Sequence, residues 1–134
     1  MADAADPFAL ASAAASLPES AYRLDPAAAP NLHAHAEGWA LGWALAAYRF
    51  ERYRSKPRAA SAAALVPPQL ADMAYVRRMA AALAMARDLI NTPAADLSPA
   101  RLADETLALA AQHGATGHCI VGDALREGFP AIHA

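Results

Sequence analysis

The sequence is poor in cysteine and lysine: Cys119 is the only cysteine and Lys56 the only lysine among 134 residues. A single cysteine excludes a disulfide framework within the chain and fits a reducing compartment. Asp3 and Asp6 stand where a signal peptide would carry positive charge. We therefore expect a cytoplasmic protein without a secretion signal.

Long apolar runs and charge of one sign are also missing. The longest strongly apolar stretch, Trp39 to Tyr48, falls well short of the about 20 residues that span a membrane, so we expect no membrane partner. The net charge of -2 gives no electrostatic footprint for nucleic acid. Glu51 interrupts the densest group of cations, which we interpret as a solvated helix end: Arg49, Arg52, Arg54, Lys56 and Arg58.

Hydrophobic residues make up 57% of the sequence, which excludes a disordered chain. Much of this fraction is alanine, so we expect a shallow core and a chain that packs against something else. Prolines divide residues 1–30 into short pieces, and we expect this region to be loosely attached, with a short extended piece at Ala21 to Leu24.

Helical spacing of apolar residues predicts a first helix over residues 37–54. Small residues at Gly38, Gly42 and Ala46 would let other backbones approach, so we expect this helix to be buried on two sides. Ala62 to Val66 is a candidate strand that ends at Pro67-Pro68.

A second helix is predicted over residues 69–90, with one apolar face made of Met73, Val76, Ala80, Leu83 and Ile90. A third helix is marked by Ser98 as N-cap, by Pro99 at the first helical position and by Gly114 after its end.

A strand at Thr116 to Val121, a short helix capped by Asp123 and ending near Gly128, and a strand at Pro130 to Ala134 are expected to follow. The order helix, strand, helix, strand predicts an α/β fold. Because a strand needs partners for its backbone groups, we expect the end of this chain to be incomplete by itself.

Three groups of side chains are candidates for chemistry. His33 and His35, with Glu37 nearby, would share a face on a strand and could bind a metal, but no further ligand follows at fitting spacing. We favour two surface histidines in a loop.

Cys119 beside His118 could form a nucleophile and base, which would make the chain a thiol enzyme. Adjacent residues on a strand point to opposite faces. We therefore favour a free, partly buried structural thiol.

The third group is the polar run from Asn91 to Asp96, which can cap one helix and hold the turn into the next. We favour that structural role over catalysis. The glycines form no phosphate loop, and we interpret Trp39 and Trp43 as packing residues rather than a ligand platform.

Three segments carry a resemblance to a known family. The run ARDLINTPAADLSP from Ala86 to Pro99 resembles a signature region of the M17 leucyl aminopeptidases, with Ala95 where the family commonly has a second Asn. GWALAAYRF, from Gly42 to Phe50, looks like the family's helix that ends in Ala-Tyr-Arg-Phe. GDALREGFPAIHA, from Gly122 to Ala134, looks like the segment that leads into the first catalytic-domain strands. Together they cover roughly residues 38–134.

The resemblance implies a two-domain, homohexameric, cytosolic exopeptidase that removes N-terminal residues from peptides. It would use two divalent metal ions, zinc or manganese, to activate a bridging water and polarise the scissile carbonyl. The family's metal ligands are a lysine, aspartates and the glutamate of an Asn-Thr-Asp-Ala-Glu-Gly-Arg motif. Asn91-Thr92-Pro93 lacks those carboxylates and Lys56 matches no ligand position. We therefore assign no catalytic, cofactor-binding or metal residue here, and expect this segment alone to bind no metal and to be inactive.

The same resemblance divides the chain into a partial N-terminal domain (residues 1–68), a linking helix (69–92) and a truncated start of the α/β catalytic domain (93–134). The alternative is a non-catalytic remnant that acts as an interaction or assembly module. The missing ligands and the helix expected to be buried on two sides motivate this alternative.

Overall fold

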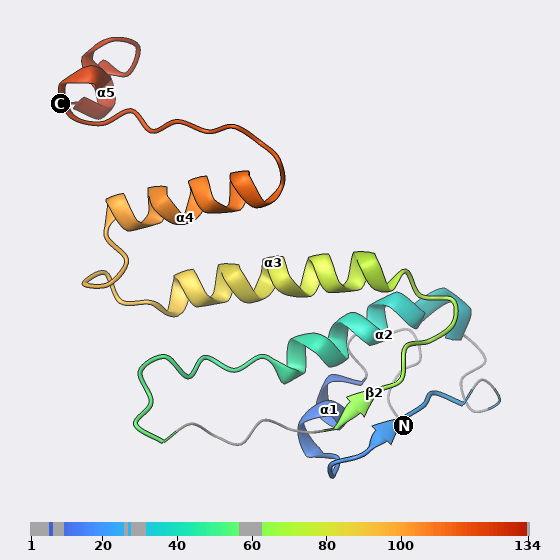
Figure 1. Cartoon of the computed structure of the whole chain (residues 1–134). Coiled ribbons are helices and arrows are strands. Elements are labelled where there is room, and N and C mark those ends of the chain that lie inside the picture. The colour runs from blue at the N-terminus through green and yellow to red at the C-terminus, as the bar shows by residue number, and fades with distance from the viewer. Residues whose placement is uncertain (1–5, 7–9, 26, 28–31, 57–62, 134) are drawn as a thin grey trace. The chain divides into compact units, whose positions relative to one another are not determined.

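The structure is a computed structural model that describes residues 6, 10–25, 27, 32–56 and 63–133 (Figure 1). The chain divides into two compact units, Met1–Asn91 and Thr92–Ala134. The fold is mixed and mainly helical, with two short strands in these ranges. None of the helices that the structure describes is long and apolar enough to cross a membrane.

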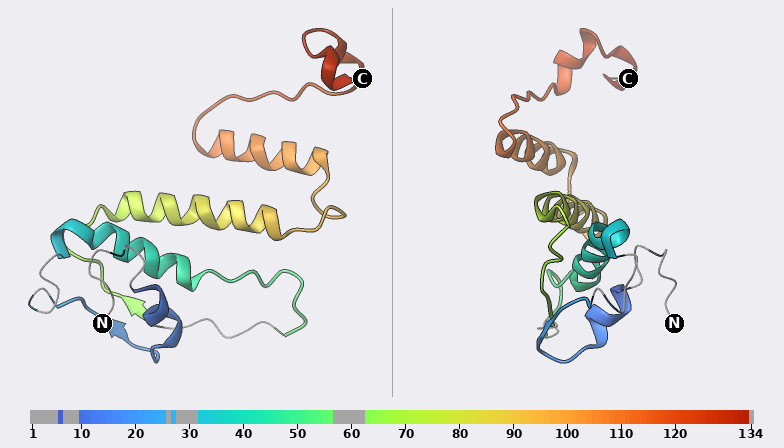
Figure 2. Two further views of the ribbon diagram at one scale, coloured as in Figure 1. Left: turned by 180° about the vertical axis from the view of Figure 1, so that it is seen from behind. Right: turned by 90° about the vertical axis from the view of Figure 1, so that its right-hand side faces the viewer.

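The first unit contains helices α1 (Ala11–Ser16), α2 (Leu32–Ala47) and α3 (Met73–Asn91). Strands β1 (Ala21–Tyr22) and β2 (Ala64–Leu65) pair in parallel, with Ala21 opposite Ala64 and Tyr22 opposite Leu65. Helix α2 packs against both α1 and α3, as the two views of Figure 2 show. The prediction that this helix is buried on two sides is therefore confirmed.

Both short strands fall inside the segments that the sequence predicted as extended, although Ala62 lies outside the described residues. The prediction of a loosely attached start is wrong for α1, because this helix packs on α2 and buries Ala14 to 1% exposure. Alanine needs little space, so an alanine-rich helix can lie close to the small residues of α2.

Helix α2 begins earlier and ends earlier than the predicted range of 37–54. Its end at Ala47 has a local cause. The guanidinium of Arg49 donates hydrogen bonds to the carbonyl oxygens of Ala46 (2.8 Å) and Tyr48 (2.9 Å). These bonds satisfy acceptors that the last helical turn leaves open, so the helix can stop there.

The core of the first unit is shallow, as alanine-rich composition predicts. Among the described residues its buried hydrophobic side chains are Ala14, Ala36, Trp39, Ala40, Trp43 and Val76. The indole of Trp39 donates a hydrogen bond to the carbonyl oxygen of Asp6 (3.1 Å), and the ring of Trp43 lies 6.1 Å from that of Tyr22. The two tryptophans are therefore packing residues, as interpreted from the sequence.

Helix α3 starts at Met73 because Asp72 caps it. One carboxylate oxygen of Asp72 accepts hydrogen bonds from the backbone N–H groups of Ala74 and Tyr75, each at 2.9 Å. Glu37 of α2 in turn accepts a hydrogen bond from the backbone N–H of Asp72 (3.1 Å). The entry into α3 is thus fixed both by its own cap and by α2.

The prediction that Ile90 belongs to the apolar face of α3 is wrong. Val76 is buried and Leu83 is half-buried, but Ile90 is 81% exposed. The half-buried residue one turn after Leu83 is Arg87, which reaches back to α2. The C-terminal end of this face is therefore polar, and Arg87 takes part in the candidate site.

The second unit contains α4 (Pro99–Gln112), a 3-10 helix η1 (Gly122–Arg126) and α5 (Pro130–His133). The bounds of α4 confirm the sequence signals. The hydroxyl of Ser98 accepts the backbone N–H of Arg101 (3.2 Å), Pro99 opens the helix, and Gly114 follows its end with φ of 69°. Only a residue without Cβ adopts that φ at little cost.

Two strands predicted in this unit are absent from the described residues. Pro130–His133 is helical, because proline suits the first turn of a helix and the carbonyl of Phe129 accepts N–H groups of Ile132 and His133. Thr116 to Val121 runs as an extended trace after α4 (Figure 1), but it pairs with no other strand among the described residues. The short helix near Asp123 is present as η1, although the side chain of Asp123 does not cap it.

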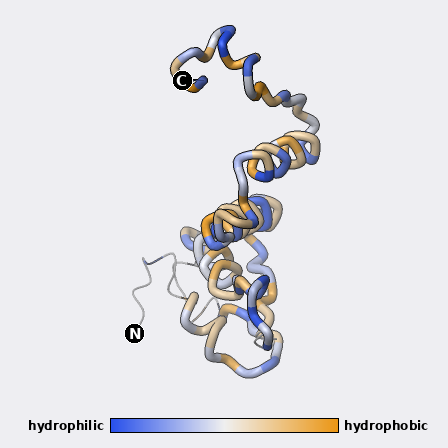
Figure 3. The backbone as a smooth tube through the Cα atoms, turned by 90° about the vertical axis from the view of Figure 1, so that its left-hand side faces the viewer, coloured by the Kyte–Doolittle hydropathy of each residue, from blue (hydrophilic) through white to orange (hydrophobic). Residues whose placement is uncertain are grey.

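No residue that the structure describes in the second unit is buried. Figure 3 shows hydrophobic and hydrophilic residues side by side along the tube. The exposed large apolar side chains here are Leu102, Leu109, Ile120, Val121, Phe129 and Ile132. This unit therefore has no core of its own in the described ranges.

Candidate functional site

The predicted histidine pair lies at the start of α2 and not in a loop. Residues two apart on a helix do not face each other, so this spacing cannot bring two imidazoles to one metal. The ring of His35 packs against Trp39 with 5.8 Å between centroids, and Glu37 bonds to the backbone of Asp72. The side chain of His33 lies outside the described residues.

No group of three or more His, Cys, Asp or Glu side chains within the described ranges could hold a metal ion. The residues present therefore do not fit the two metal ions that the resemblance implies.

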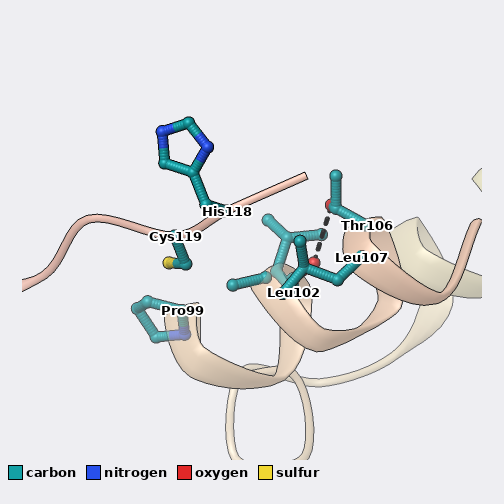
Figure 4. A pocket seen from close by; sticks show the side chains of 7 residues that line it. Pro99, Leu102, Thr106, Leu107, His118 and Cys119 are labelled. Carbon is teal, nitrogen blue, oxygen red and sulfur yellow. Dashed lines mark hydrogen bonds between the residues drawn. The ribbon is translucent and has the colours of Figure 1, made fainter. Parts of the chain in front are cut away.

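A small pocket of about 320 Å³ lies in the second unit, between α4 and the extended segment Thr116 to Val121. Its lining is mostly apolar: Pro99, Leu102, Ala103, Thr106, Leu107, His118 and Cys119. In Figure 4 the sulfur of Cys119 points toward Pro99, whereas the ring of His118 points away from it. The two side chains therefore do not form a nucleophile and base.

Cys119 is a free thiol, as expected, but it is exposed and not partly buried. A covered strand would partly bury this thiol, and the described residues provide no such cover.

The polar cluster at the ends of α2 and α3 was not predicted. We call it the Tyr48 cluster, and it consists of Tyr48, Arg87, Asp88 and Asn91. The hydroxyl of Tyr48 donates to Asp88 (2.7 Å) and accepts from the amide of Asn91 (3.3 Å). The guanidinium of Arg87 lies over the Tyr48 ring, 5.3 Å from its centroid, and donates to the carbonyl oxygen of Leu45 (3.3 Å).

The electrostatics of this cluster favour a neutral tyrosine. Partial burial, and then the hydrogen bond to Asp88, raise the pKa of Tyr48 above its ordinary value of 10.0, although Asn91 and Arg87 oppose the shift. The hydroxyl therefore stays protonated near neutral pH and acts as a hydrogen-bond donor, not as a base. The cluster joins two helix ends.

The Tyr48 cluster also explains the polar run that starts at Asn91. The side chain of Asn91 is used by Tyr48, and the carbonyl of Pro93 accepts the N–H groups of Asp96 and Leu97 in a turn before α4. These contacts are structural, as the sequence interpretation favoured. The cluster could not be predicted from one sequence, because nothing in the sequence pattern indicates that Tyr48 contacts Arg87 and Asp88 some 40 positions later.

The arginine-rich segment after α2 has local partners. Arg54 pairs with Glu51 at 3.7 Å, Arg52 lies 5.6 Å from the centroid of the Tyr53 ring, and Arg49 closes α2. Lys56 is exposed, and Arg58 lies outside the described residues. Because α2 ends at Ala47, the segment is a solvated turn region and not the predicted helix end. Its local contacts do not indicate a phosphate-binding patch.

Comparisons with known proteins agree with this architecture. Residues 1–68 match the family model of the M17 aminopeptidase N-terminal domain. The solved cytosol aminopeptidase from Coxiella burnetii is 29% identical, with a TM-score of 0.88, over 100% of this chain and 28% of that chain. The bottromycin maturation enzyme BotP is 30% identical, with a TM-score of 0.72, over 92% of this chain and 28% of that chain. No curated protein matches the chain.

The family model covers half of the chain, and the chain belongs to the M17 aminopeptidase family. The segment corresponds to the N-terminal part of such an enzyme and spans 28% of the length of the two solved structures. The Tyr48 cluster joins two of the segments on which the resemblance rests, Gly42 to Phe50 and Ala86 to Pro99.

Proposed function

We propose that this chain is the N-terminal portion of a leucyl-aminopeptidase-type metallopeptidase, which removes N-terminal amino acids from peptides in the cytoplasm. The main support is the whole-length likeness to a cytosol aminopeptidase, with a TM-score of 0.88 over 100% of this chain. The match of residues 1–68 to the M17 N-terminal domain supports it independently. As in the family, the complete enzyme would be a homohexamer.

In this proposal residues 1–68 form part of the N-terminal domain, residues 69–92 form the linking helix, and residues 93–134 begin an α/β catalytic domain. The Tyr48 cluster would hold the end of the linking helix against the N-terminal domain, because it ties the last turn of α3 to the end of α2. A fixed helix end gives a constant starting point for the chain that follows.

Two divalent metal ions, zinc or manganese, would supply the hydrolytic chemistry in the complete enzyme. Since the described residues of this chain do not fit a metal site, we assign the ligands to the part of the family fold that this chain does not span. This segment would contribute architecture and no reacting group.

The test is the release of leucine from leucyl peptides, with added Mn²⁺, by a protein that carries this chain joined to a complete M17 catalytic region. We expect metal-dependent release, and none from the 134-residue chain alone under the same conditions. Absence of leucine release by the soluble joined protein would refute the proposed activity.

The second candidate function is a non-catalytic assembly module. The exposed apolar side chains of the second unit favour it, since they need a covering partner. It predicts that the chain alone is stable and monodisperse. Aggregation, or a state that binds hydrophobic dyes, would count against it.

A further inference from the structure

A second cluster of charged and titratable side chains lies in the second unit, where η1 and α5 pack against each other. The charged or titratable side chains of these two elements are Asp123, Arg126 and His133. Glu127, directly after η1, is exposed and has no ion pair within the described part of the chain. The imidazole of His133 is the least exposed group, at 27%, against 68% for Arg126 and 85% for Asp123. His133 is therefore the member of this cluster that its neighbours affect most.

One ring nitrogen of His133 has two partners with opposite requirements. Its Nε2 lies 3.2 Å from Nε of Arg126, which always carries a hydrogen and can only donate. The same Nε2 lies 3.3 Å from a carboxylate oxygen of Asp123, which only accepts when it is ionised. A nitrogen with a free lone pair can bond to Arg126 but not to Asp123, and a nitrogen with a hydrogen can do only the reverse. The two contacts are therefore alternatives.

The other contacts of the cluster favour Arg126 as the partner of the neutral ring. The carboxylate oxygen of Asp123 already accepts from Nη2 of Arg126, at 3.1 Å. The Nε–H of Arg126 has no acceptor other than His133 among the described residues. A hydrogen on Nε2 would leave that donor without an acceptor, so the neutral ring should carry its single hydrogen on Nδ1.

Protonation reverses this choice. In the imidazolium both ring nitrogens carry hydrogens, so Nε2 donates to Asp123 and the ring repels the guanidinium of Arg126. Histidine is the side chain that ordinarily changes its charge between about pH 5 and pH 8. The exchange of partners is therefore accessible near neutral pH.

We propose that His133 is a proton-operated switch that exchanges Arg126 for Asp123 and thereby changes how α5 is tied to η1. Neutral His133 accepts from Arg126, whereas protonated His133 donates to Asp123 and releases the Nε–H of Arg126. Because both partners are largely exposed, each contact adds little to stability, and the switch selects a partner without unfolding the turn. This inference is independent of the proposed function, since it involves no substrate and no metal ion.

NMR of the side chains tests the switch in the whole 134-residue chain. The chemical shifts of the two ring nitrogens distinguish the two neutral tautomers and the imidazolium. We expect the Nδ1–H tautomer of His133 at about pH 8, and an imidazolium with a hydrogen-bonded, downfield Nε2–H at about pH 5. The Nε–H proton of Arg126 should shift upfield at the lower pH, because it loses its acceptor.

Two substitutions separate the two contacts. Arg126→Ala removes the donor, so the preference for the Nδ1–H tautomer at about pH 8 should be lost while the Nε2–H stays downfield at about pH 5. Asp123→Ala removes the acceptor, so the tautomer preference should remain while the downfield Nε2–H signal is lost. Both residues are exposed, so neither change threatens a core. Glu127→Ala is the control and should change neither signal.

The Nε2–H tautomer of His133 at about pH 8 in the unchanged chain would overturn the proposal, because Asp123 would then be the partner of the neutral ring as well. Ring signals that respond equally to Arg126→Ala and Asp123→Ala, or to neither, would also overturn it. Such signals would show that the imidazole does not exchange one partner for the other.

Discussion

Val76 offers the sharpest test of how the first unit is held together. It is 2% exposed and is the largest fully buried side chain among the described residues. Val76→Ala removes two methyl groups, each worth about 0.8 kcal/mol when buried. Incomplete relaxation around the cavity adds to this loss, and the better helix propensity of alanine offsets up to about 0.5 kcal/mol. We expect unfolding of this unit to become easier by about 2 kcal/mol.

Tryptophan fluorescence during urea unfolding measures this change. Both tryptophans of the chain, Trp39 and Trp43, are in the core of the first unit, so the signal reports that unit. With a slope of about 1–2 kcal/mol per molar urea, the midpoint should fall by about 1–2 M.

Ile90→Ala is the matched control, since it also replaces a β-branched residue of α3 but at a position that is 81% exposed. Its effect should stay within about 0.5 kcal/mol. Equal effects of the two substitutions, or none from Val76→Ala, would refute the packing of α3 described above.

Three further substitutions test single features. Backbone N–H groups, first that of Tyr75 and then that of Ala74, hold the pKa of Asp72 below its ordinary 3.8. The stabilising effect of the Asp72 carboxylate is therefore complete above pH 3.8 and is lost as the pH falls through the lowered pKa. The stability advantage of the wild type over Asp72→Asn, from urea unfolding, should shrink below about pH 3.8, and a constant difference would contradict the cap. Tyr48→Phe removes the hydroxyl of the Tyr48 cluster, so amides in the last turn of α3 should exchange faster, and unchanged rates would show that the cluster does not hold this helix end. Ser98→Ala removes the cap of α4 and should cost the helix about 1 kcal/mol, seen as faster exchange in its first turn, while unchanged exchange there would argue against the cap.

Features with a local cause were predictable from the sequence. The bounds of α4 follow from Ser98, Pro99 and Gly114, which act on their own neighbours in the chain. The short strands β1 and β2 were also located correctly, within segments bounded by proline or turn residues.

Features that depend on distant contacts were not predictable from a single sequence. Periodicity placed Ile90 on the apolar face of α3, but Arg87 takes the inward position because Tyr48 and Leu45 lie within its reach. The early end of α2 depends on how Arg49 folds back on the helix end. The sequence pattern does not indicate which of the several arginines in this region bonds to the last carbonyl oxygens of the helix.

The segment Thr116 to Val121 shows a third limit. Its composition predicts a strand, and its backbone is extended, but strand pairing is a property of two segments and not of one. The sequence of the partner strand is needed to predict the pairing.

The most direct test of the proposed function is to read the coding sequence past the codon for Ala134. The account predicts an open frame that encodes a lysine, aspartates and an Asn-Thr-Asp-Ala-Glu-Gly-Arg run, the residue types that hold the two metal ions in the family that this chain resembles. A stop codon directly after Ala134 would contradict an aminopeptidase mechanism for this protein and would favour the assembly module instead.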